Sequence, residues 1–194
     1  LDTRSGRVAE SDVYTGQVPE RSRIMKGIIF NFVEDFVTET LSADAWDDVL
    51  ASSGVDGSYT SLGAYSDDDF SGIIGSAAAV IGLSEDATLK SSARRGFAYL
   101  ARKAPAFLEG VDEWRSAYLA FDDAAHPEVI AIFLDQGGAS LKIVPDGDDL
   151  IVTFKSKRGL CALVDGLMRG CGDWFEVDLS VEHLSCVHRG DESC

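Results

Sequence analysis

The spacing of apolar residues changes near residue 140, and this change limits the folds open to the chain. From residue 32 to 121, apolar side chains recur three and four positions apart, which is typical of amphipathic helices. Later, two apolar, partly β-branched runs, 141–144 and 150–156, flank a Pro-Asp-Gly turn and predict a β-hairpin. The order of elements, a helical first half followed by strand, strand, helix and strand, therefore predicts an α+β fold with an antiparallel sheet.

Smaller signals set the ends of these elements. Ser66, followed by three aspartates, predicts the start of one helix, and Ser84 followed by Glu85 and Asp86 predicts the start of the next. After the hairpin, a helix is expected over 160–168, ended by the glycines at 170 and 172. Alternating apolar and polar residues over 175–181 then predict a half-buried strand.

The 194-residue chain is expected to form a single domain over residues 25–194. Residues 1–24 lack periodicity, and we expect them to be a disordered extension or a remnant left by cloning, with Met25 as the natural start. No apolar run approaches 18 residues and no apolar signal core precedes the domain, so we expect a cytoplasmic protein. The C-terminus falls where we expect a further strand, which suggests truncation.

Charge excludes two classes of partner. Lys and Arg number 17 against 33 Asp and Glu, which gives a net charge of −16. Neither a nucleic-acid backbone nor an anionic membrane surface is a suitable partner for so acidic a domain.

Cysteine and histidine gather near the C-terminus. His183 and Cys186 are three positions apart, Cys194 follows, and Cys161 or Cys171 is available as a fourth ligand. Tetrahedral zinc takes four such N and S ligands, so the group predicts a zinc site, with incidental reduced thiols as the alternative. His188 competes with His183 on spacing alone.

Two further groups are candidates for binding a ligand. His126 precedes an apolar helical face, where a neutral imidazole is suited to bind haem iron, although a helix-cap histidine is the more ordinary interpretation. Ser156 and Arg158 share one strand face and are suited to clamp a carboxylate or phosphate, with a solvated strand end as the alternative. The sequence shows no catalytic triad and no phosphate loop, so no enzyme is predicted.

Taken together and in order, these motifs resemble the haem nitric-oxide/oxygen-binding (H-NOX) family, in its bacterial zinc-containing form. The resemblance runs from Met25 to Cys194. It is carried by Met-Lys-Gly-Ile-Ile-Phe at the start, His126-Pro-Glu-Val, Phe154-x-Ser-x-Arg and the tail His183-x-x-Cys-x7-Cys.

The resemblance implies a helical N-terminal part that packs on an α/β C-terminal part, with haem b held between the two parts. His126 would be the proximal iron ligand, and Ser156 and Arg158 would bind the haem propionates, with Phe154 beside them. It also implies zinc bound by Cys161, His183, Cys186 and Cys194, which prefers Cys161 to Cys171 and His183 to His188. Arg158→Ala should then release haem more readily than Lys157→Ala, because Lys157 lies on the opposite strand face.

The sequence departs from the family pattern at three positions. Phe154 stands where the family has Tyr, which removes one hydroxyl from the propionate site. Ala139 occupies the position of a Pro that presses on the haem, so a flatter haem is expected. Pro127 disfavours helical geometry at His126, so the ligand helix is expected to kink or start there.

Leu163 and Leu167 match distal positions, and an apolar distal pocket offers bound oxygen no hydrogen-bond donor. We therefore expect a sensor that binds nitric oxide and carbon monoxide at ferrous haem and binds oxygen poorly. It would signal to a separate partner, a histidine kinase or a cyclic-di-GMP enzyme. The alternative is a zinc/thiol redox sensor of the same fold that has lost haem, and a haem enzyme is least favoured.

Overall fold

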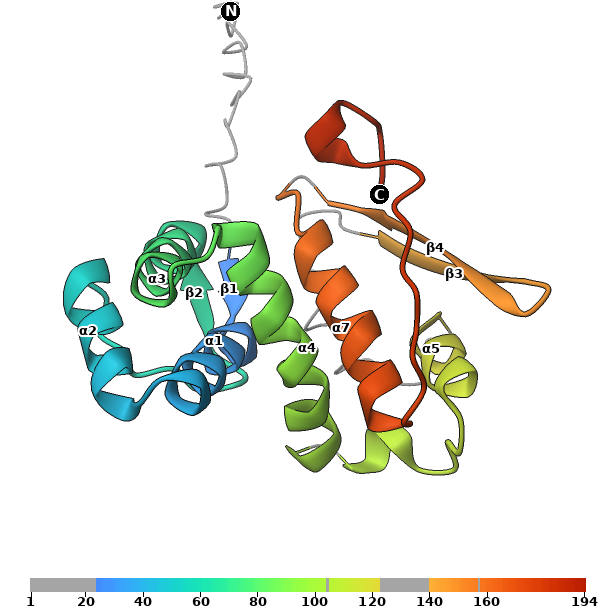
Figure 1. Cartoon of the computed structure of the whole chain (residues 1–194), viewed down its shortest axis with the longest axis horizontal. Helices are drawn as coiled ribbons and strands as arrows, with labels where there is room; N and C mark the ends of the chain where they lie inside the picture. Colours follow the sequence, from blue (N-terminus) through green and yellow to red (C-terminus); the bar gives the residue numbers. More distant parts are fainter. Residues whose placement is uncertain (1–23, 104, 123–139, 157) are drawn as a thin grey trace, which may run out of the picture.

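The computed structural model describes residues 24–103, 105–122, 140–156 and 158–194. Figure 1 shows α1, α2 and α3 grouped with a small sheet on one side, and α5 with a β-hairpin on the other. Helices α4 and α7 lie next to each other between these groups, so they join the two parts. The helices are α1 (Gly27–Thr40), α2 (Ala43–Ser53), α3 (Asp67–Ile81), α4 (Glu85–Lys103), η1 (Pro105–Leu108), α5 (Trp114–Asp122), α7 (Cys161–Trp174) and η2 (Val187–Arg189).

The predicted helix starts are confirmed by their caps. Ser66 Oγ accepts from the backbone N–H of Asp69, whose carboxylate accepts in turn from the backbone N–H of Ser66, so α3 begins with a complete capping box. Ser84 Oγ accepts from the backbone N–H of Ala87 and so caps the start of α4 with its side chain. Local sequence therefore decides where these two helices begin.

Two antiparallel pairs of strands make up the sheet structure of the described residues. Strand β1 (Ile24–Lys26) pairs with β2 (Ala64–Ser66), and β3 (Ser140–Asp146) pairs with β4 (Asp149–Lys155) in a register that matches Leu141 with Phe154. Gly147 has φ 59° in the turn between β3 and β4, a backbone region that glycine adopts without strain. The predicted α+β class and the hairpin are both confirmed.

Helix α7 continues past the glycines that were expected to end it. A Cβ atom on Gly166 would collide with the carbonyl oxygen of Lys90, and one on Gly170 would collide with that of Arg94, both on α4. These two glycines therefore let the backbones of α4 and α7 approach closely. The expectation of a helix end at Gly170 was wrong because Gly170 serves this packing, and α7 runs to Trp174.

The predicted strand over 175–181 is also wrong. Glu176 turns the chain with φ 57°, and Val177 N donates to Gly172 O, so the chain reverses directly after α7. Figure 1 shows the following segment running back alongside α7. Its apolar alternation reflects contact with this helix, since Leu179 packs at Gly172, and no strand pairs with it among the described residues.

The hydrophobic core lies among α1, α3, α4 and α7, where Phe32, Phe97 and Leu163 are almost fully buried. It joins the helical part to the C-terminal part in one continuous cluster. Within the described ranges, no single helix has the length and apolar composition to cross a membrane. The pair α3 and α4 meets these criteria only jointly, and it is bent by 95°.

Candidate functional site

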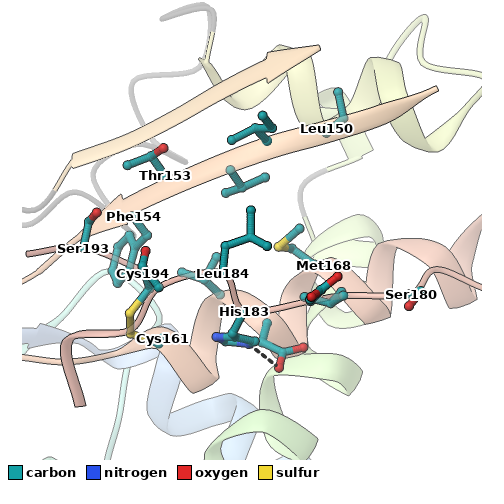
Figure 2. A pocket seen from close by; sticks show the side chains of 17 residues that line it. Leu150, Thr153, Phe154, Cys161, Met168, Ser180, His183, Leu184, Ser193 and Cys194 are labelled. Carbon is teal, nitrogen blue, oxygen red and sulfur yellow. Dashed lines mark hydrogen bonds and ion pairs between the residues drawn. A yellow bond between two sulfur atoms is a disulfide. The ribbon is translucent and has the colours of Figure 1, made fainter. Parts of the chain in front are cut away.

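A cavity lies between β4, α7 and the C-terminal segment (residues 175–194), and three of the candidate metal ligands line it. Figure 2 shows Phe154 from β4, Cys161 from α7 and His183 and Cys194 from the C-terminal segment around this cavity. The cavity wall also contains Asp165 from α7. Residues more than 30 positions apart in the sequence therefore face one space.

Backbone pairing brings the last residue to the first turn of α7. Cys194 N donates to Phe154 O at 2.9 Å, and Phe154 N donates to Cys194 O at 2.7 Å. Cys194 thereby forms a disulfide with Cys161, at the start of α7. The expectation of thiols rather than a disulfide was therefore wrong for this pair, and the reciprocal hydrogen bonds with Phe154 place Cys194 beside the end of β4, close in sequence to Cys161.

Cys186 completes a group of three sulfurs. Its Sγ lies 3.7 Å from Cys194 Sγ, and the ligand atoms of Cys161, Cys186 and Cys194 all lie within 4.8 Å of one another. Cys171 is fully buried elsewhere on α7, beside Tyr118. The structure thus gathers three of the four predicted zinc ligands, and it places Cys171 apart from them.

Both histidines of the tail have other partners. His183 Nε2 lies 3.0 Å from Asp165 Oδ2, and His188 Nε2 lies 2.7 Å from Gly159 O. Neither histidine belongs to the sulfur group, although His183 lines the same cavity. His183 is therefore the histidine that shares a cavity with Cys161 and Cys194.

Asp165 is the centre of an ionic cluster that the sequence analysis missed. Its side chain is 1% exposed, and it accepts from Lys90 Nζ at 2.6 Å, Arg169 Nε at 2.6 Å and His183. Burial opposes ionisation of Asp165, but the hydrogen bonds from Lys90, His183 and Arg169 outweigh it and lower the pKa of this carboxyl. The signal in the sequence was an acidic residue inside an apolar helix segment, between Val164 and Leu167.

The residues expected to clamp a carboxylate lie between the two parts of the fold. Arg158 Nε donates to Asp67 Oδ2 at 2.9 Å, at the start of α3, and the Arg158 side chain is only 13% exposed. Ser156 Oγ accepts from the backbone N–H of Arg158. The guanidinium is thus held in position and already binds a carboxylate, that of Asp67, which the sequence analysis did not identify.

An apolar cavity separates the hairpin from α5 and α7. Only apolar atoms line its exposed surface, and Phe154 and Leu167 contribute to its wall. Tyr118 also borders this space, and burial first, then nearby Cys171, raises the pKa of its hydroxyl. Leu163 lies one turn before Leu167 on α7 and is 4% exposed in the core. The described residues thus form a small pocket whose exposed surface is apolar, between the hairpin, α5 and α7.

Several residues of the sequence analysis lie outside the described residues. These are residues 1–23 of the expected extension, His126, Pro127, Ala139 and Lys157. On either side of residues 123–139, the described chain ends at Asp122, the last residue of α5, and resumes at Ser140, the first residue of β3. Both of these elements border the apolar cavity, through Tyr118 and Leu141.

Comparison with known proteins gives a consistent family and fold. The model of a family described as haem-NO-binding matches residues 26–183. An H-NOX protein from S. oneidensis, in its Fe(II)NO ligation state, is 24% identical, with 88% of this chain and 96% of that chain covered and a TM-score of 0.77. An unliganded Fe(II) H-NOX protein from K. algicida is 23% identical, with 83% and 90% covered and a TM-score of 0.68. Curated proteins yield no match to this chain.

Proposed function

Because this chain belongs to the haem-NO-binding family, a family of haem-based gas sensors, we propose that it senses nitric oxide. Haem b, when bound, would supply a ferrous iron site for nitric oxide and carbon monoxide. The observation that best supports the proposal is the apolar cavity between the hairpin, α5 and α7. The largely buried Arg158 lies in the connection between β4 and α7, two elements that line this cavity. We assign a binding function to the chain and no catalytic reaction.

Each of the candidate residues has a role that its chemistry supports. His126 would ligate the iron through a neutral ring nitrogen. Ser156 and Arg158 would hold the haem carboxylates, and the hydrogen bond that Arg158 donates to Asp67 supports a carboxylate-binding role for this guanidinium. Phe154 is 5% exposed and packs at the wall without a hydroxyl to donate.

Ligand choice would follow from the distal side. Leu163 and Leu167 carry no donor for a polar diatomic ligand, which favours nitric oxide and carbon monoxide over oxygen. These positions and roles support poor oxygen binding by the ferrous protein.

The signal would pass through the junction of the two parts. Arg158 on the C-terminal side and Asp67 on α3 form an ion pair across this junction, and α4 and α7 also pack against each other between the two parts. A change in the relative position of the parts would alter both contacts and present a different surface to a partner. A histidine kinase or a cyclic-di-GMP enzyme, acting as a separate chain in the cytoplasm, is the proposed partner.

An absorption spectrum of the purified ferrous protein tests the proposal. We expect a Soret band that shifts with nitric oxide and carbon monoxide and keeps its position in air. His126→Ala should abolish the band, and Arg158→Ala should speed haem loss to apomyoglobin. Lys155→Ala, at an exposed residue at the end of β4, is the matched control for a lost positive charge. No Soret band after reconstitution with haem would contradict the proposal.

The sulfur group favours a second candidate function, a zinc/thiol redox sensor. We propose that the reduced chain binds zinc through Cys161, Cys186, Cys194 and His183. The three sulfurs within 4.8 Å support this site, and the Cys161–Cys194 disulfide supports a second, oxidised state of the same group. Thiolate ligation and this disulfide exclude each other, because both use the sulfurs of Cys161 and Cys194.

Zinc release tests this second function. Hydrogen peroxide would oxidise the Cys161 and Cys194 thiols to the disulfide, with peroxide reduced to two waters, and zinc would leave. We expect one zinc per reduced chain, released as this disulfide forms. Cys171→Ser should behave like wild type, because Cys171 lies outside the sulfur group. Reduced protein that binds no zinc, or holds zinc unchanged in peroxide, would contradict the redox function.

A further inference from the structure

The carboxylate of Asp165 is held by three side chains. Oδ1 accepts from Arg169 Nε at 2.6 Å, and Oδ2 accepts from Lys90 Nζ at 2.6 Å and lies 3.0 Å from His183 Nε2. Lys90 comes from α4, and Arg169 comes from one turn later on α7. Two cations on different elements thus fix the carboxylate at a single position beneath the C-terminal segment.

The contact with Asp165 decides which nitrogen of His183 is free. An ionised carboxylate can only accept, so Nε2 carries the proton and donates to Asp165 Oδ2. In the neutral ring, Nδ1 then keeps its lone pair. In Figure 2 the dashed line leaves one ring nitrogen of His183, and the other nitrogen is turned to the side on which Cys161 is drawn. Cys161, Cys194 and His183 line the same cavity.

We propose that Asp165 is a positioning residue that prepares His183 to bind zinc through Nδ1, beside Cys161, Cys186 and Cys194. This inference rests on the zinc site proposed above and goes beyond it, because it assigns the binding nitrogen and the residue that selects it. A metal-binding histidine commonly donates its other ring N–H to a carboxylate, which fixes the tautomer and makes the ligand nitrogen more basic. Asp165, held by Lys90 and Arg169, supplies such a carboxylate.

The structure describes this arrangement with the sulfurs in the disulfide state. His183 lines the cavity but stands outside the group of sulfurs, so it must move toward them when zinc binds. It lies on a segment without strand pairing, which allows such a movement. Asp165 is on the rigid helix α7, in the next turn after Cys161, and so fixes the direction from which His183 approaches.

A measurement on the wild-type protein tests the assignment without any substitution. We would record long-range ¹H–¹⁵N correlation spectra of the reduced, ¹⁵N-labelled chain before and after one equivalent of zinc. The expected result is that His183 Nδ1 takes the nitrogen shift of a metal ligand while Nε2 stays protonated. A zinc-bound Nε2, or a His183 ring whose shifts do not respond to zinc, would overturn the assignment and leave the zinc site standing.

Substitution gives an independent test through zinc affinity, measured by competition with a chromophoric chelator under reducing conditions. Asp165→Asn should weaken zinc binding by roughly tenfold or more. In a His183→Ala background, Asp165→Asn should produce no further loss. An equal loss in both backgrounds would mean that Asp165 only stabilises the fold.

Asp173→Asn is the matched control. Asp173 lies on the same helix and pairs with Arg94. Its side chain is half exposed, and it is not among the residues that line the cavity. We expect wild-type zinc affinity for this variant. If the reduced wild-type chain binds no zinc at all, the zinc site itself is wrong and the role of Asp165 falls with it. Zinc bound through another nitrogen refutes the role of Asp165 alone.

Discussion

The close approach of α4 and α7 predicts that Gly166→Ala destabilises the protein. An added Cβ would collide with the carbonyl oxygen of Lys90 and lie 2.7 Å from Ala93 Cβ. The backbone of α4 cannot give way as a flexible side chain would, so the cost lies near 3 kcal/mol, the upper end of the usual range for overpacking. Alanine has a higher helix propensity than glycine by about 1 kcal/mol. The net expected loss is about 2 kcal/mol of unfolding free energy.

Urea unfolding followed by circular dichroism would measure this loss, with both proteins held in the same redox state. Gly75→Ala is the matched control, because it makes the same substitution within a helix but meets only Glu85 Oε1, at 3.6 Å. The control should be stabilised by up to about 1 kcal/mol. The two variants should therefore differ by about 3 kcal/mol. A difference below about 1 kcal/mol would refute the packing argument.

Three other predictions concern charge, thiols and ligand choice. Asp165→Asn should cost about 2 kcal/mol of unfolding free energy near pH 7, because it removes the buried charge to which Lys90 and Arg169 are paired, although both partners are partly exposed. Since folding lowers the pKa of Asp165 from its ordinary value of 3.8, its contribution is complete above that value and is lost as the pH falls through the lower folded pKa. Urea titrations should show the gap from wild type closing below pH 4, and a constant gap would contradict this. Burial raises the pKa of the Cys171 thiol to about 12, so iodoacetamide should label Cys186 and spare Cys171 in the native oxidised protein, as peptide mass spectrometry would detect. Equal labelling rates would show that Cys171 is accessible. Leu163→Tyr should add a distal hydroxyl, so that the Soret band of the ferrous variant shifts in air while that of wild type does not, and an unchanged band would argue against Leu163 as a distal residue.

Local sequence was sufficient for much of the fold. The cap at Ser66 needs only a hydroxyl and a carboxylate three positions later, and the hairpin turn needs only a glycine at Gly147 between two apolar runs. The α+β class, and the order of helices, hairpin and α7, followed from such short-range signals. The cysteines and histidines of the tail were also identified as a group from their spacing.

Contacts between remote segments decided the rest. Sequence could not show that Gly170 serves packing against Arg94, and the same glycine therefore suggested a helix end. The alternation over 175–181 suggested a strand because contact with one helix face imposes the same period as a sheet. In both cases a residue pattern has two structural causes, and only the neighbour in space distinguishes them.

The candidate sites divide in the same way. The sequence by itself determined which residue types are available: His126, Ser156 and Arg158 for haem, and three cysteines with a histidine for zinc. Only the tertiary structure decided that Asp67 holds Arg158 and that Asp165 holds His183. Those partners lie 91 and 18 positions away in the chain, and ionic contacts over such separations depend on how helices pack. Local periodicity carries no information about that packing.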